Sequence, residues 1–226
     1  MNNLTLLIPA NKESESLPIF LNELNDYSCR KMIVLQEEDV ETIDSISNFK
    51  DVELLIQKKR GYGSALQEGI KNIKTEFFCI INADGSMDPK YLKEMLLLCE
   101  KNDFVFASRY LKGGGSDDDD IVTFVGNKCF SLIGNLLFTL NLSDILYTFI
   151  IGKTNSAKML ELKYHDFRIC VEIPIKTKIG KFLFTSTPSK ERKRIGGKKK
   201  VNALIDGFLI LTAIIELFLK KILKFK

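Results

Sequence analysis

The feature of this sequence that most constrains its fold is a series of short apolar runs separated by segments with helical periodicity. The runs have the length of β-strands and lie at residues 4–8, 32–35, 53–56, 77–81 and 104–107. Between them, apolar side chains recur at helical spacing in residues 17–24, 64–73 and 91–99. Strands that alternate with helices indicate a mostly parallel sheet. The sequence therefore predicts an α/β fold, with a mostly parallel central sheet flanked by helices.

Length and charge divide the chain into one domain and a basic C-terminal segment. A chain of 226 residues, 45% of them hydrophobic, can bury the core of one domain but is short for two. The segment from residue 176 onward holds 14 Lys and Arg against 3 acidic residues, and the preceding part is acidic overall. A basic segment on an acidic body indicates a charged partner. We expect one domain over residues 1–200, followed by a separate element over residues 201–226.

Histidine and cysteine usage narrows the chemistry. His165 is the only histidine, and the five cysteines lack the spacing of a zinc site or a disulfide framework. Reduced thiols are typical of a cytoplasmic protein. Catalysis is therefore left to carboxylates, cations and a metal ion.

Polar side chains follow the apolar run at residues 77–81. In open α/β sheets, ligands bind beyond the carboxyl ends of the strands. Asn82 and Asp84 follow the run at this edge, and alternate residues of an extended chain share a face. A carboxylate there suits Mg²⁺ or Mn²⁺ bridging diphosphate oxygens. The alternative is an ordinary turn before a helix.

A glycine-containing segment follows the run at residues 53–56 and opens a helix. Glycines such as Gly61 and Gly63 allow close backbone approach, and a helix N-terminus beside Arg60 favours an anion. The spacing is not that of a P-loop. The alternative is an ordinary glycine turn.

Seven motifs in a fixed order carry a resemblance to a known family. They are IPANKE at 8–13, RGYGSAL at 60–66, INADGSMDP at 81–89, ASRYLKGGG at 107–115, SDILYT at 143–148, VEIPIK at 171–176 and RIGGKKKVN at 194–202. Over nearly its full length, the chain resembles family 2 glycosyltransferases of the dolichol-phosphate mannose synthase type.

This resemblance implies a GT-A fold that binds a nucleoside-diphosphate sugar. It implies the following roles: Pro9 and Glu13 in the nucleotide pocket, Asp84 on the metal, Arg109 facing phosphate groups, Arg194 with Lys199 or Lys200 in a basic loop over the diphosphate, and Glu172 at the family's acidic position. We add Arg60, Gly61 and Gly63 as substrate-binding residues.

Three positions depart from the family pattern. The usual Asp-x-Asp reads Asn82-Ala83-Asp84, so Ser86 is expected to help Asn82 and Asp84 hold the metal. The usual aspartate pair after the second strand is Gln36 and Glu37, and we assign substrate binding to Glu37. The tyrosine and asparagine usual before the first glutamate are Asn11 and Lys12.

The acceptor determines whether the reaction needs a base. A polyprenyl phosphate oxygen is already anionic and needs no base. Cations and a metal that stabilise the departing diphosphate are then enough for catalysis. Attack from the face opposite the nucleotide would invert the anomeric carbon. A sugar hydroxyl needs a carboxylate to take its proton. The candidates are Asp144 and residues 117–120, although a run of four aspartates is typical of a solvated loop.

The C-terminal segment predicts an amphipathic helix over residues 201–226. Its apolar run is too short for a typical membrane span, so a helix lying in the membrane interface, with lysines near anionic lipid, is the favoured interpretation. The alternative is a helix packed on the body or on a partner in a homodimer.

These observations predict a glycosyltransferase peripheral to the cytoplasmic face of a membrane, with a nucleoside-diphosphate sugar and a lipid phosphate as partners and no nucleic acid. A sugar-nucleotide pyrophosphorylase is a weaker alternative, because its glycine-rich signature follows the first strand and the first glycine here is Gly61. The other alternative is a catalytically degenerate binding protein at the membrane, motivated by Asn82 in place of the usual aspartate.

Overall fold

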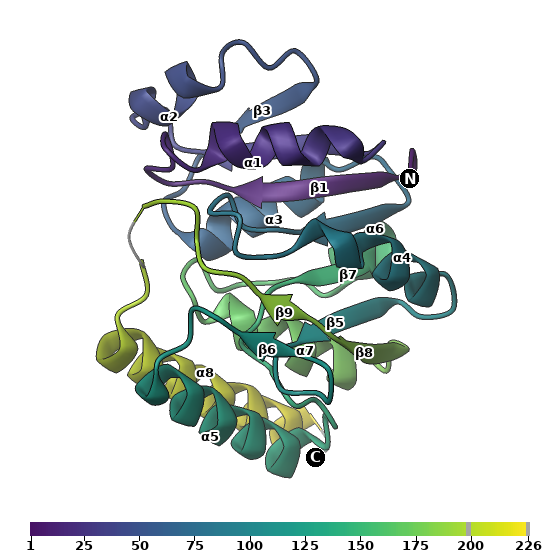
Figure 1. Cartoon of the computed structure of the whole chain (residues 1–226). Coiled ribbons are helices and arrows are strands. Elements are labelled where there is room, and N and C mark those ends of the chain that lie inside the picture. The colour runs from purple at the N-terminus through teal and green to yellow at the C-terminus, as the bar shows by residue number, and fades with distance from the viewer. Residues whose placement is uncertain (198–199, 225–226) are drawn as a thin grey trace.

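The computed structural model describes residues 1–197 and 200–224, and it confirms the layered α/β architecture (Figure 1). The strands are β1 Leu4–Pro9, β2 Arg30–Leu35, β3 Val52–Ile56, β4 Phe77–Ile80, β5 Phe104–Ser108, β6 Gly115–Ser116, β7 Ile150–Lys153, β8 Phe184–Pro188 and β9 Lys190–Glu191. The α-helices are α1 Leu17–Glu23, α2 Val40–Ser45, α3 Tyr62–Asn72, α4 Leu92–Glu100, α5 Ile121–Phe138, α6 Thr154–Met159, α7 Ile169–Ile179 and α8 Ala203–Lys224. Short 3₁₀ turns lie at Leu24–Asp26 and Pro89–Tyr91.

The main sheet has the order β3-β2-β1-β4-β7-β5-β8. Its strands run parallel, except that β7 is antiparallel to both β4 and β5. The parallel pair β6 and β9 forms a separate small ribbon. The carboxyl ends of β1 and β4 therefore lie next to each other, because these two strands are parallel neighbours at the centre of the sheet.

Both faces of the sheet are buried, as the continuously apolar strands predict. In β1, Leu7 faces one core, with apolar side chains of α3, α6 and α7, while Leu6 and Ile8 face the other, with those of α1 and α4. This alternation follows from the period of two in a strand. The core is thus a helix–sheet–helix sandwich, and the site is built from the ends of its central strands.

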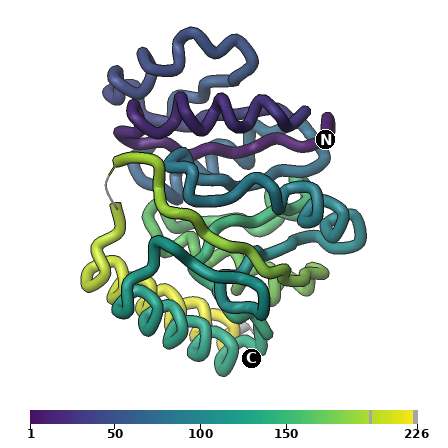
Figure 2. Tube along the Cα trace, in the orientation of Figure 1, coloured from purple at the N-terminus to yellow at the C-terminus, as the bar shows by residue number. Residues whose placement is uncertain are grey.

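The helices α5 and α8 lie side by side at one end of the molecule (Figures 1 and 2). Phe138 of α5 and Phe218 of α8 make an edge-to-face contact with ring centroids 5.8 Å apart. The buried side chains of α8 are Ile210, Ala213, Ile214 and Leu217. The C-terminal helix therefore packs on the body through one apolar stripe, and most of its other apolar side chains remain exposed.

Candidate functional site

A cavity of about 460 Å³ opens at the carboxyl ends of β1 and β4. This is the edge at which the sequence predicts ligand binding. The predicted site residues that line it are Pro9, Glu13, Gly61, Asn82, Asp84, Ser86, Arg109, Arg194 and Lys200. Segments from both halves of the chain thus meet at one place.

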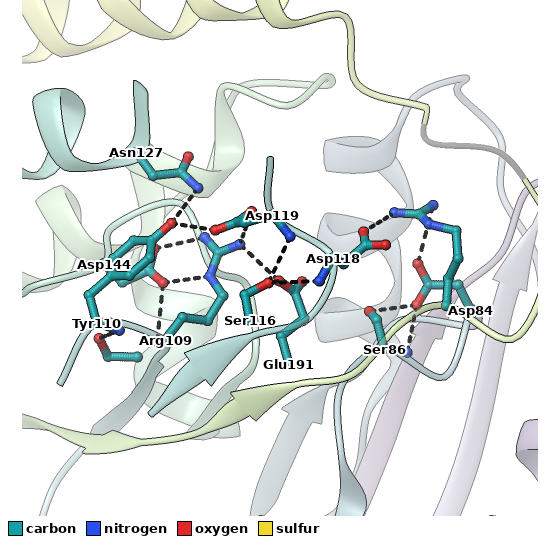
Figure 3. A network of polar contacts seen from close by, with 12 residues as sticks. Asp84, Ser86, Arg109, Tyr110, Ser116, Asp118, Asp119, Asn127, Asp144 and Glu191 are labelled. Atoms are coloured by element: carbon teal, nitrogen blue, oxygen red, sulfur yellow. Dashed lines mark hydrogen bonds and ion pairs between the residues drawn. The ribbon is translucent and has the colours of Figure 1, made fainter. Parts of the chain in front are cut away.

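Asp84 lies just beyond β4, in a tight turn. Its Oδ1 accepts hydrogen bonds from the backbone nitrogen of Ser86 at 3.0 Å and from Ser86 Oγ at 2.7 Å (Figure 3). Its Oδ2 lies 3.7 Å from Nη1 of Arg194. The side chain is therefore fixed through one oxygen, while the other faces a positive charge in the cavity.

Asn82 lies beside Asp84 and contacts a hydroxyl pair. Tyr62 donates to Asn82 Oδ1 at 3.3 Å, and its hydroxyl oxygen lies 2.7 Å from that of Thr148. Burial raises the pKa of Tyr62 far above its ordinary value, so the phenol stays protonated. Tyr62 is also stacked on Phe167 with centroids 5.2 Å apart. Tyr62, Thr148 and Phe167 line the cavity, and none of the three was predicted from the sequence as a site residue.

The basic segment after β9 reaches back over the strand ends. Arg192 donates to the Gly85 carbonyl oxygen at 2.7 Å, and Arg194 donates to Asp118 Oδ2 at 2.7 Å. The hydrogen bond to Asp118 raises the pKa of Arg194. Lys200 Nζ lies 3.1 Å from Oε1 of Glu13. Two cations of this segment therefore face acids of the site.

Arg109 lies in the cavity wall, surrounded by carboxylates (Figure 3). Its Nε and Nη2 donate to Asp144 at 2.7 and 3.0 Å, and its Nη1 donates to Asp119 and Glu191, both at 3.2 Å. Burial disfavours its charge, but Asp144 and Glu191 hold the pKa of Arg109 above its ordinary value. Burial also raises the pKa of Glu191. The guanidinium group, expected to face phosphate, is bonded to three acids instead.

The N-terminus of α3 is closed, contrary to the expectation of an anion site there. The backbone nitrogen of Ser64 donates to the His165 carbonyl oxygen, and a Cβ added at Gly61 would lie 2.1 Å from that oxygen. A Cβ added at Gly63 would lie almost as close to the carbonyl oxygen of Tyr164, and Gly63 does not line the cavity. The exposed Arg60 pairs with Glu38. These glycines therefore allow one backbone segment to approach another, and of the three assigned residues only Gly61 reaches the cavity.

Three further assignments do not meet in the cavity. Glu37 is exposed, and Gln36 and Gln57 line the cavity in its place. Glu172 is buried, accepts hydrogen bonds from the backbone nitrogens at 163 and 164, and pairs with Lys176 at 2.9 Å. Glu172 therefore has a structural role. The Lys199 assignment lies outside the described residues.

The acidic loop before α5 is ordered by its own contacts and turns into the cavity. Ser116 Oγ accepts hydrogen bonds from the backbone nitrogens of Asp118 and Asp119, and Asp119 accepts from the Tyr110 hydroxyl at 2.6 Å. Both aspartates line the cavity. The solvated-loop interpretation is therefore wrong for these two, whereas Asp117 remains exposed.

The oxygen atoms around Asp84 fit a divalent metal ion that also contacts a substrate. Asp84 offers a carboxylate, and Asn82 and Ser86 offer neutral oxygens within the same turn. Among the described residues, no group of three or more His, Cys, Asp and Glu side chains is placed to hold a metal. Mg²⁺ in such sites takes one or two carboxylates and completes its shell with phosphate and water.

Known proteins resemble this chain in sequence and in fold. Uncharacterized glycosyltransferases of Mycobacterium tuberculosis and Mycobacterium bovis are 27% identical over 95 residues, which is 40% of this chain. The match spans 43% of the length of those relatives.

Solved structures show the fold. The glucosyl-3-phosphoglycerate synthase of Mycobacterium tuberculosis, in complex with Mn²⁺, uridine diphosphate and phosphoglyceric acid, matches 95% of this chain and 78% of its own at a TM-score of 0.68 and 12% identity. The same enzyme with Mg²⁺ and uridine diphosphate matches at a TM-score of 0.65 and 14% identity. The α/β fold of this chain is thus the GT-A fold of these glycosyltransferases. A model of glycosyl transferase family 2 matches residues 5–160, well over half of the chain, and the chain therefore belongs to that family.

Proposed function

We propose that this glycosyltransferase moves a sugar from a nucleoside-diphosphate donor to an acceptor at a membrane surface, with help from a divalent metal. The observation that carries the proposal is Asp84, which lies at the end of β4 with one oxygen held by Ser86 and the other facing Arg194. A carboxylate beside cations in one cavity can bind a metal and a diphosphate together.

The donor is proposed to lie across the carboxyl ends of β1 and β4. Pro9, Glu13, Gln36 and Gln57 line this end of the cavity and are offered as the nucleoside-binding residues. Gln36 and Gln57 present amide groups that can both donate and accept hydrogen bonds, as recognition of a base requires.

Asp84, Asn82 and Ser86 are proposed to hold Mg²⁺ or Mn²⁺. Both ions accompany uridine diphosphate in the similar synthase structures. The bound ion would neutralise charge on the diphosphate. Arg194 and Lys200 add protein charge at the same place, so they stabilise the leaving group as its charge grows.

The acceptor is proposed to be a polyprenyl phosphate or a membrane-proximal glycan, with inversion at the anomeric carbon. The resemblance to dolichol-phosphate mannose synthases favours a lipid-linked acceptor. We further propose that residues 1–200 form the donor-binding domain and that residues 201–226 place it on the cytoplasmic face of the membrane. The exposed apolar side chains of α8, Phe208 and Leu219 among them, support that placement.

The test is a panel of UDP-, GDP- and other activated sugars, with and without Mg²⁺ or Mn²⁺, in which donor binding and nucleotide release are measured. We expect metal-dependent release from one donor. The Asp84→Asn substitution should lower that release by about 10²-fold or more, since it removes the only carboxylate of the proposed ligand set. Asp117→Asn, a matched change on an exposed aspartate, should leave the rate unchanged.

A second candidate function is that of a catalytically degenerate donor-binding protein. Asn82 favours it, because this residue supplies no charge where the family usually has a carboxylate. Donor binding without release for any sugar would support this candidate. The absence of donor binding across the whole panel would contradict both candidates.

A further inference from the structure

The chain segment that carries Arg194 is fixed to the turn that carries Asp84. The backbone nitrogen of Ile195 donates to the carbonyl oxygen of Asp84 at 2.8 Å, and the backbone nitrogen of Arg192 donates to the carbonyl oxygen of Ser86, also at 2.8 Å. These two hydrogen bonds lie on either side of Arg194 in the sequence. The path of the backbone therefore holds the Arg194 side chain at this turn.

Arg194 faces the oxygen of Asp84 that is better placed to accept a metal ion. Ser86 holds Oδ1 of Asp84 through two hydrogen bonds, which leaves Oδ2 for a further cation. Nη1 of Arg194 lies 3.7 Å from this Oδ2, and Asp118 accepts a hydrogen bond from Nη2 of the same guanidinium group at 2.7 Å. The Arg194 side chain is 24% exposed and that of Asp84 is 13% exposed, so solvent ions screen repulsion between two cations here only in part.

The proposed metal ligands carry little negative charge with which to offset this repulsion. Asp84 is their single carboxylate, because Asn82 stands where the family usually has an aspartate and Ser86 is neutral. One negative charge of the ligands is thus faced by one positive charge of Arg194. A divalent ion that arrives alone meets an attraction from Asp84 that Arg194 largely offsets.

A nucleoside diphosphate changes this balance. Divalent ions at such sites complete their coordination with substrate phosphate oxygens, which bring further negative charge. The same phosphates give the Arg194 guanidinium group an anion to bind, and such charge-assisted hydrogen bonds are strong. Arg194 therefore repels a lone metal ion but attracts the ion together with a diphosphate.

We propose that Arg194 makes metal binding depend on the nucleotide: it opposes binding of a lone divalent ion at Asp84 and favours the ion that binds together with a diphosphate. This inference rests on the proposed function and adds a form of regulation to its site. Coupling between two binding sites is reciprocal, so the ion strengthens nucleotide binding by the same factor by which the nucleotide strengthens binding of the ion.

The first measurement is Mn²⁺ binding to the full-length protein without nucleotide, followed by loss of the free-ion signal in electron paramagnetic resonance. The second is the affinity for UDP and GDP, measured by calorimetry in saturating Mn²⁺ and in EDTA. Couplings between sites usually change affinity by about 5- to 150-fold. We expect Arg194→Met to raise the affinity for Mn²⁺ alone by about 5-fold or more, and to lower nucleotide affinity in saturating Mn²⁺.

Lys193→Met is the matched control. Lys193 precedes Arg194 in the sequence, is exposed and does not line the cavity. Its substitution makes the same change of charge, so a general effect of charge in this segment would appear in both variants. We expect Lys193→Met to bind Mn²⁺ and nucleotide like the unmodified protein.

Asn82→Asp tests the ligand charge separately, because it adds a carboxylate and leaves Arg194 in place. We expect this variant also to bind Mn²⁺ more tightly without nucleotide. An unchanged affinity for Mn²⁺ alone in Arg194→Met, or an equal rise in Lys193→Met, would overturn the proposal. An unchanged affinity in Asn82→Asp would instead contradict the proposed metal ligands, and nucleotide binding that is the same in Mn²⁺ and in EDTA would contradict the proposed metal-assisted function.

Discussion

At the residue scale, two arginines of the cavity have opposite environments. Arg109 is buried and bonded to three carboxylates, whereas Arg194 is partly exposed and contacts two. Removing one partner of a buried ion pair leaves uncompensated charge in a low dielectric. The same substitution at the two positions should therefore damage different properties.

We expect Arg109→Met to lower the free energy of unfolding by about 3–5 kcal/mol, since Asp144 is left buried without a cation. Arg194→Met should change stability much less and lower nucleotide release instead. Thermal unfolding and the release assay, run on both variants, check the two expectations. Equal loss of stability would contradict the division of roles.

The sequence predicts the positions of some of these residues and not of others. Asp84 was placed correctly because a carboxylate directly after a buried strand must lie at the sheet edge. The environment of Arg109 was not predictable, because Asp144 and Glu191 are 35 and 82 residues away along the chain and only the fold brings them together. The inward turn of Asp118 and Asp119 depends on Ser116, whose hydroxyl gives no signal of its own in sequence.

At the element scale, the start of α3 is defined by a close approach of two backbone segments. Gly61 has φ of 113°, and its added Cβ would meet the His165 carbonyl oxygen. Gly126, inside α5, has no neighbouring atom within 4 Å of an added Cβ. These two glycines thus form a matched pair.

Gly61→Ala should destabilise the protein by more than about 1–3 kcal/mol, the cost of the backbone strain alone. Gly126→Ala should stabilise it by about 0.5–1 kcal/mol, because alanine is the better helix former. Chemical denaturation of the two variants checks the signs. A stabilised Gly61→Ala variant would show that the 164–166 segment yields easily.

The strands β1 to β5 were predictable, because each is a short apolar run bounded by polar residues. The strands β7 and β8 were missed. Ile150–Lys153 ends in glycine and lysine, and Phe184–Pro188 has three consecutive hydroxyl residues between its phenylalanine and its proline, so neither carries a continuous apolar signal. The antiparallel direction of β7 comes from packing between β4 and β5 and has no local signature.

At the scale of the whole molecule, α5 and α8 present exposed apolar side chains at one end. The largest exposed fractions are those of Leu204 at 86%, Ile121 at 82% and Leu136 at 79%. Among the described helices, α5 is the one long and apolar enough to cross a membrane by length and composition, and 22% of it is buried. A surface patch of this kind usually marks an interaction site.

Replacing Phe208 and Leu219 together by Glu should weaken flotation of the protein with anionic liposomes, because two charges would enter the apolar face. Leu97→Glu, on an exposed leucine of α4, is the control and should float like the unmodified chain. Deleting α8 is less informative, since it would uncover the core at Ile214. Unchanged flotation of the double variant would argue for the alternative, a protein partner or a second copy.

The segment that reaches over the cavity continues directly into α8. Lys200 contacts Glu13, and α8 begins at Ala203, three residues later. Three extended residues span about 10 Å. Under the proposed placement of α8 on a membrane, this tether keeps the charged end of a bound donor within about that distance of the start of α8. An acceptor group that projects farther from the membrane would then have to bend back to be glycosylated.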